Sequence, residues 1–161
     1  TMDAFKVVSD WHHFAIIDLT ECEGFKFTTQ TFSRRLGISM VQVTAAIDRL
    51  LRLELLERTP EGLYKKTKDH FLSEAKFQNE AMLRFHRQIL NKLIPGLETQ
   101  KRDERLSRTD IVLIDPADYA SVEQIMGEAA EKVVKLALKS KSKSRVAALS
   151  MHFFNLLPER K

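Results

Sequence analysis

Residues 28–56 constrain the fold more than any other part of this chain. Phe32 and Leu36 are four residues apart, which places both side chains on one face of a first helix. Gly37 follows directly, at a position where a helix end favours the left-handed backbone that glycine adopts at little cost. The pattern therefore predicts a short helix that ends in a tight glycine turn.

A second helix is predicted directly after this turn. Ser39 can cap it, and Gln42, three residues later, completes a capping box. Apolar residues then recur at spacings of three, four and seven, at Val43, Ala46, Ile47 and Leu50. Two short helices, a glycine turn and a shared apolar interior describe a helix-turn-helix, with an ordinary helical hairpin as the alternative.

The same stretch resembles the winged helix-turn-helix domains of bacterial transcription regulators. Residues 32–39 match the turn of those domains, and the apolar positions of the second helix match their recognition helix. Such domains usually have a glycine where this chain has Glu54, directly before Leu55 and Leu56. The resemblance implies a small hairpin, the wing, after the second helix. Residues 57–67 fit it, because a Pro-Glu-Gly turn signal lies at their centre.

Further helices are predicted on both sides of this stretch. Ser9 or Asp10 can cap a first helix that continues to Leu19. His12 and His13 are adjacent, so they point to different sides, form no helical metal pair and are expected at the surface or half buried. Residues 73–100 have a helical apolar pattern. That helix is expected to connect domains or to form a dimer, or else only to close the core of its own domain.

The C-terminal part is predicted to be a small βαβ unit. Residues 106–114 are rich in β-branched residues and read as a strand. Asp115 and Pro116 then form a strong helix start, and the helix continues to a polar loop at residues 139–145. Residues 146–157 read as a second, parallel strand. Because a two-stranded sheet is rarely stable alone, we expect it to pack on the first half or to pair with a second copy.

Nearly the whole chain is similar to an uncharacterised bacterial family of predicted transcription regulators. The similarity rests on short motifs that run from Asp10-Trp11-His12-His13 to Phe154-Asn155-Leu156. It implies an α+β, mostly helical fold. The expected parts are a winged helix-turn-helix at 2–72, a connecting or dimerisation helix at 73–104 and a βαβ subdomain at 105–161.

Charge is concentrated on the predicted helix-turn-helix. Between positions 24 and 70 nine Lys or Arg residues stand against five Asp or Glu residues, so this stretch carries the whole net charge of +4. That distribution favours a face that binds a polyanion, or simply an uneven solvated surface.

The single cysteine, Cys22, and the absence of a long apolar run favour a cytoplasmic protein without a membrane span. The sequence contains no glycine-rich phosphate-binding loop, no cluster of metal-ligating residues and no hydrolase motif. We therefore expect no enzyme activity, cofactor or metal.

These observations favour a DNA-binding transcription regulator that contacts double-stranded DNA. The second helix, about residues 40–53, would enter the major groove, and basic residues would hold the phosphate backbone. Its outermost residues are Val41, Ala45, Asp48 and Arg52, which is an apolar and acidic face for reading bases. The alternative is therefore a winged helix repurposed to bind a protein partner, and a homodimer is a further possibility. The predicted DNA-binding residues are Lys26, Arg34, Arg35, Ser39, Gln42, Thr44, Ala45, Arg49, Arg52, Arg58, Lys65 and Lys66.

Overall fold

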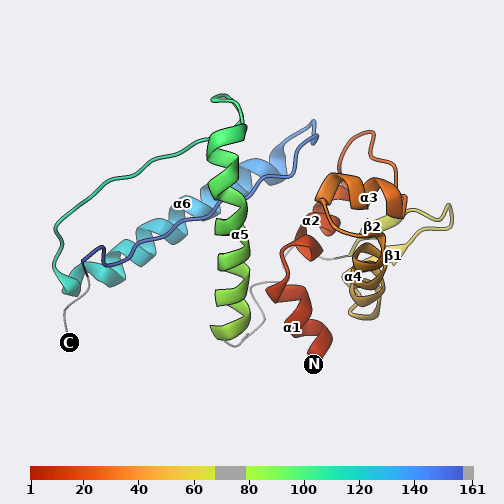
Figure 1. The fold of residues 1–161 in the computed structure, drawn as a ribbon, viewed down its shortest axis with the longest axis horizontal. Coiled ribbons are helices and arrows are strands. Elements are labelled where there is room, and N and C mark those ends of the chain that lie inside the picture. Colours follow the sequence, from red (N-terminus) through yellow and green to blue (C-terminus); the bar gives the residue numbers. More distant parts are fainter. Residues whose placement is uncertain (68–78, 158–161) are drawn as a thin grey trace. The chain divides into compact units, whose positions relative to one another are not determined.

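The computed structural model describes residues 1–67 and 79–157, as an α+β and mostly helical chain (Figure 1). The chain divides into two compact units. Unit 1 comprises Thr1–Gln100 together with Ser142–Ala147, and unit 2 comprises Lys101–Lys141 together with Ala148–Lys161. Among the described helices, none combines the length and the apolar character that a bilayer crossing requires.

The two helices predicted around the glycine turn are confirmed. α3 spans Thr29–Leu36 and ends at Gly37, whose φ of 67° is left-handed. α4 spans Met40–Arg52 and begins with the predicted capping box. In that box Ser39 Oγ accepts from the Gln42 N–H at 3.2 Å, and Gln42 Oε1 accepts from the Ser39 N–H at 2.9 Å.

The core of unit 1 is built on the apolar stripe of α4. The stripe consists of the four predicted residues Val43, Ala46, Ile47 and Leu50, and all are buried. α4 packs with this face against α1, α2 and α3, and its end contacts β1. Phe32 of α3 is fully buried in the same cluster. Burial of each of the three larger side chains, Val43, Ile47 and Leu50, contributes about 1.5–3 kcal/mol, so this stripe determines which face of α4 remains exposed.

Glu54 adopts the backbone conformation that a glycine would favour. Its φ is 55°, and no other non-glycine residue in the described chain has a positive φ. The Glu54 N–H donates to the Leu51 carbonyl at 3.0 Å, and the Leu55 N–H donates to the Leu50 carbonyl at 2.9 Å. These two bonds form a Schellman motif that ends α4 and turns the chain inwards, where Leu55 and Leu56 are buried.

The hairpin predicted after α4 is confirmed. β1 spans Leu56–Arg58 and β2 spans Tyr64–Lys66, and they pair antiparallel with Glu57 opposite Lys65. The Thr59 N–H donates to the Leu63 carbonyl at 2.8 Å and closes the turn. β1 contacts α4, and β2 contacts α2, so the hairpin lies beside the helices in Figure 1.

An unpredicted helix precedes the first predicted one. α1 spans Met2–Ser9, and α2 spans His12–Leu19. The prediction that Ser9 or Asp10 caps α2 is wrong, because Trp11 is the N-cap residue and makes no side-chain cap. Asp10 instead ends α1. Its carboxylate accepts from Arg84 at 2.9 Å and from Gln88 at 3.1 Å.

His13 is fully buried, which corrects the expectation of a surface or half-buried side chain. Arg49 Nη1 donates to His13 Nε2 at 3.0 Å, and His13 Nδ1 lies 2.9 Å from the Asp10 carbonyl. Because the guanidinium can only donate, Nε2 accepts and Nδ1 carries the proton, so the ring is neutral. Burial lowers the pKa of His13 to about 4.

The long helix of unit 1 closes the same core. α5 spans Asn79–Thr99 and packs against α1, whereas its predicted first residues, 73–78, lie outside the described residues. Ala81 is fully buried, and the Phe85 ring meets Phe14 edge to face at 5.6 Å. Lys92 Nζ lies 3.9 Å from the centre of the Trp11 ring. These contacts agree with the simpler of the two expected roles, a helix that completes its own domain.

Unit 2 contains the predicted helix but not the predicted strands. Asp115 accepts from the Ala117 N–H at 2.9 Å and caps a short 3-10 turn, η1 (Pro116–Asp118), which leads into α6 (Tyr119–Lys139). The βαβ prediction is wrong, since residues 106–114 and 146–157 form no strand. The second segment is divided instead between the units, with residues 146–147 in unit 1 and residues 148–157 in unit 2, where Phe153 packs on Tyr119.

Unit 1 should lose about 3 kcal/mol of unfolding free energy as the pH falls from 6.5 towards 4. The unfolded chain binds a proton on His13 at its ordinary pKa of 6.5, whereas the folded chain resists protonation until about pH 4. The stabilising contribution is therefore complete above pH 6.5 and is lost below it. Urea titrations followed by the fluorescence of Trp11, the single tryptophan, measure this dependence. His13→Gln should flatten it and His152→Gln should not; an equal slope in both variants would contradict the assignment.

Glu54→Gly should raise the unfolding free energy of unit 1 by about 0.5–1 kcal/mol. The left-handed backbone conformation costs a residue with a side chain about 1–2 kcal/mol, and glycine avoids this cost. The greater conformational entropy of glycine in the unfolded chain cancels only part of this stabilisation. Glu57→Gly is the matched control, because Glu57 lies in β1 and the same change should destabilise there. Urea denaturation compares the two variants, and a destabilised Glu54→Gly protein would show that the side chain matters more than the backbone strain.

Candidate functional site

The exposed side of α4 carries an open, mostly apolar hollow. It has a volume of about 390 Å³ and is lined by Met40, Val41, Thr44, Ala45 and Asp48, which together are called the α4 outer face below. Val41 is 79% exposed and Met40 is 56% exposed, so both side chains are available to a partner. Burial of the opposite stripe in the core leaves this face outside.

Two predicted DNA contacts on α4 are held by another helix. Arg49 Nε donates to Asp3 Oδ1 at 3.2 Å, and Arg52 Nε donates to Asp3 Oδ2 at 2.9 Å. The Arg49 side chain is only 19% exposed, because its other end reaches the buried His13. The hydrogen bond from Arg52 lowers the pKa of the Asp3 carboxyl below its usual value. Asp3 thus offsets the charge at the C-terminal end of α4.

The polar residues at the start of α4 are also engaged. Ser39 and Gln42 bond each other in the capping box, where Gln42 Oε1 accepts from both the N–H and the Oγ of Ser39. Thr44 Oγ1 donates to the Met40 carbonyl at 3.0 Å. The Ala45 side chain is a methyl group and has no hydrogen-bonding atom. The α4 outer face therefore presents mainly apolar groups, and Gln42 keeps its amide N–H groups as donors.

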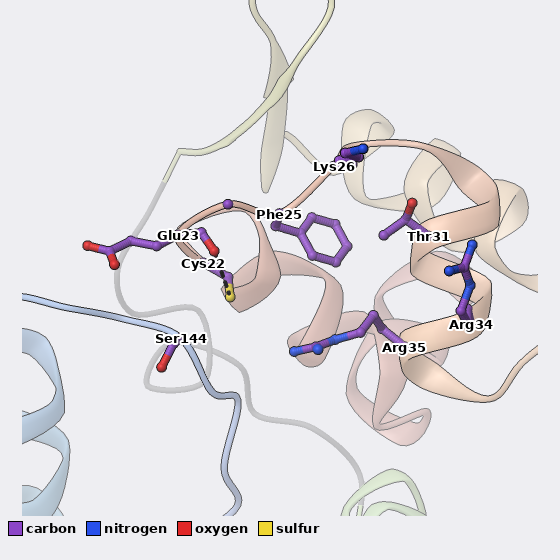
Figure 2. A pocket seen from close by; sticks show the side chains of 9 residues that line it. Cys22, Glu23, Phe25, Lys26, Thr31, Arg34, Arg35 and Ser144 are labelled. Carbon is purple, nitrogen blue, oxygen red and sulfur yellow. Dashed lines mark hydrogen bonds between the residues drawn. The ribbon is translucent and has the colours of Figure 1, made fainter.

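Three other predicted residues gather around a cavity beside α3. This cationic cavity has a volume of about 420 Å³, and Lys26, Arg34 and Arg35 line it together with Cys22, Glu23, Gly24, Phe25, Thr31 and Ser144. Arg35 reaches from α3 towards the Cys22 side, while Arg34 projects near Thr31 (Figure 2). All three cations are exposed, and within residues 1–67 and 79–157 they have no ion-pair partner.

The one carboxylate at the cationic cavity points away from these cations in Figure 2. Glu23 Oε2 accepts from Ser142 Oγ at 2.9 Å. Its backbone N–H donates to the Lys143 carbonyl at 2.8 Å. The positive charge of the cavity is therefore left uncompensated by this acid, and the site can hold an anionic group.

The cations of the hairpin are more restricted. Arg58 donates to the Tyr64 hydroxyl at 3.0 Å and lies 5.4 Å from the centre of that ring. Lys65 forms an exposed pair with Glu57 at 3.8 Å. Lys66 pairs with Glu21 at 3.8 Å, and its side chain is only 12% exposed. Exposed pairs such as Lys65 with Glu57 contribute little and exchange readily, whereas Lys66 is part of the folded body.

The twelve predicted site residues thus fall into separate groups. The structure brings Lys26, Arg34 and Arg35 together at one cavity, but it places Arg49, Arg52 and Lys66 in ion pairs within the fold. The sequence did not indicate the role of Asp3, which lies on the unpredicted helix α1 and forms ion pairs with both Arg49 and Arg52. An acidic residue in the first turn of an apolar eight-residue segment was the available signal.

The family described as Domain of unknown function (DUF4423) matches residues 1–156, and the chain belongs to that family. Neither a curated protein nor a solved structure matches the chain.

Proposed function

We propose that this DUF4423 protein binds duplex DNA as a winged helix-turn-helix domain and acts as a transcription regulator. The chain order of α3, glycine turn, α4 and hairpin supports this proposal, since winged helix-turn-helix domains share it. The observation that carries it is the cluster of Lys26, Arg34 and Arg35, three exposed cations without an ion-pair partner in the described chain. Unneutralised cations beside a helix that presents one exposed face fit a phosphate backbone better than any other common partner.

In this arrangement α4 enters the major groove and the cationic cavity holds the backbone. Val41 and Ala45 are exposed on the α4 outer face and would contact thymine methyl groups. Gln42 cannot form the paired contact to adenine while its Oε1 stays in the capping box, so it would only donate. Arg49 does not take part, because Asp3 and His13 hold it. Affinity would therefore come mainly from phosphate contacts, and base discrimination would be modest.

The hairpin contributes a smaller share. Lys65 can leave its exposed pair with Glu57 to meet a phosphate, and Arg58 stays stacked on Tyr64. Lys66 is excluded from this role by its burial against Glu21. Each protein chain would thus contact about three to four DNA phosphates, and this number determines how steeply the affinity falls with salt.

Binding to random duplex DNA should weaken with salt at a log–log slope of about −3 per bound chain. The slope follows from release of counterions when about three cations meet phosphates. Arg34→Ala with Arg35→Ala should reduce the magnitude of the slope by about 2 and weaken binding at low salt without unfolding unit 1. Fluorescence anisotropy of a labelled duplex at several salt concentrations measures both effects.

The matched control is Lys101→Ala with Arg102→Ala, which removes the same charge from unit 2. This control should leave the slope and the affinity nearly unchanged. Two results would contradict the proposal: no binding by the wild-type chain at about 50 mM salt, where phosphate contacts are strong, or equal losses in both double variants. Circular dichroism and Trp11 fluorescence establish whether each variant is folded.

A second candidate function is protein binding through the α4 outer face. The observation that favours it is the apolar hollow at Met40, Val41 and Ala45, with Asp48 at its edge. Typical protein-binding patches combine such an apolar centre with a charged rim. In this case the cationic cavity would be incidental, and duplex DNA would not contact α4.

Val41→Lys separates the two candidate functions. If α4 lies in the groove, the added ammonium should tighten binding to random duplex DNA several-fold and make the salt slope steeper by about 1. If the α4 outer face binds protein, duplex affinity should not change. Val134→Lys in α6 is the control, the same substitution at an exposed valine of unit 2 that is 48% exposed. Equal effects of the two substitutions would indicate a general charge effect and would count against groove binding by α4.

A further inference from the structure

Unit 2 leaves its apolar side chains uncovered. Between residues 101 and 157 no described residue of this unit is buried, although apolar residues are frequent there. Leu106, Ile111 and Leu113 are between 81% and 104% exposed, and Leu157 is 88% exposed. A segment of this size folds by removing apolar surface from water, so these residues require a covering surface.

α6 has two apolar faces, and only one of them is partly covered by its own unit. Val122 and Met126 are half buried, and the Tyr119 ring meets Phe153 edge to face at 5.6 Å. Ile125 and Leu136 lie on a neighbouring face, three helical turns apart, with Ala129 and Lys132 between them. Ile125 is 65% exposed and Leu136 is 70% exposed. The two large apolar side chains of this face, called the α6 open face below, are mostly uncovered by the described part of unit 2.

Charge is distributed along α6 in two halves. Residues 118–129 contain the acids Asp118, Glu123 and Glu128 and no Lys or Arg. Residues 130–141 contain one acid, Glu131, and four lysines, which are Lys132, Lys135, Lys139 and Lys141. A helix with an acidic first half and a basic second half is complementary to itself when two copies lie antiparallel.

We propose that unit 2 forms a homodimer in which the α6 open faces of two copies pack antiparallel. A twofold axis near the middle of α6 places Ile125 against the partner's Leu136, and the reciprocal contact follows from the symmetry. Ala129 lies near that axis and allows the helices to approach closely. Glu128, which flanks the open face, comes opposite the partner's Lys132.

A second copy suits this surface because the same patch supplies both the apolar contacts and the opposite charge. In a parallel pair, by contrast, the acidic halves would face each other and the basic halves would face each other. The proposal concerns unit 2 alone and holds whether or not unit 1 binds DNA.

Size-exclusion chromatography with light scattering tests the dimer on the full chain. The wild-type protein should have twice the 18.6 kDa mass of a single chain at micromolar concentrations. Leu136→Glu should weaken the dimer about 100-fold or more, since the substitution occurs twice in each dimer. Leu138→Glu is the matched control, because residues two positions apart do not share a helix face, and it should leave the dimer intact. Circular dichroism verifies that both variants keep their helix content.

Charge reversal tests the antiparallel arrangement. Glu128→Lys alone and Lys132→Glu alone should each weaken the dimer several-fold, because each brings like charges together across the axis. The double variant restores the complementarity between copies and should recover most of the wild-type affinity. Glu128 and Lys132 are also four residues apart on the same helix, so circular dichroism must show equal helix content in all three variants before the rescue is assigned to the dimer contact.

Three outcomes would overturn the proposal. A wild-type chain that stays monomeric at hundreds of micromolar would show that something other than a second copy covers the α6 open face. Equal loss from Leu136→Glu and Leu138→Glu would show that this face is not the contact. A double reversal that binds no better than the single ones would reject antiparallel packing.

Discussion

Burial of one stripe of α4 is the interaction on which the rest of unit 1 depends. Val43 and Leu50 are fully buried, and they fix the rotation of α4 about its own axis against α2 and α3. The Schellman turn at Glu54 then directs Leu55 and Leu56 inwards and starts the hairpin. Because the buried side is fixed, the exposed side is fixed as well, and α4 can present only the α4 outer face to a partner.

Electrostatics within unit 1 then decide which cations remain available to that partner. Asp3 binds both Arg49 and Arg52, and the neutral His13 accepts from Arg49 in the interior. Asp3 thereby offsets one of the two positive charges at the C-terminal end of α4. Positive charge without a carboxylate partner is left at the cationic cavity beside α3, so the proposed contact with a polyanion lies on α3 and the loop before it more than on α4.

Local signals explain which features could be predicted from the sequence. The capping box at Ser39, the left-handed Gly37 and the Asp115 cap each depend on residues within a few positions of each other, and all three occur in the structure. The contacts of Asp3 and the burial of His13 join distant segments, and no local pattern indicates them. The prediction of two strands in unit 2 was wrong for a related reason. β-branched runs favour an extended chain, but a sheet also requires a neighbouring strand, and unit 2 supplies helix α6 instead.

An NMR titration of the isotope-labelled chain with random duplex DNA tests the central claim most directly. The account predicts that the backbone signals of Lys26, Arg34 and Arg35 and those of the first turns of α4 shift together, while α6 signals stay in place. Shifts confined to unit 2, or a spectrum unchanged at low salt, would contradict the assignment of α3 and α4 as the DNA-binding surface.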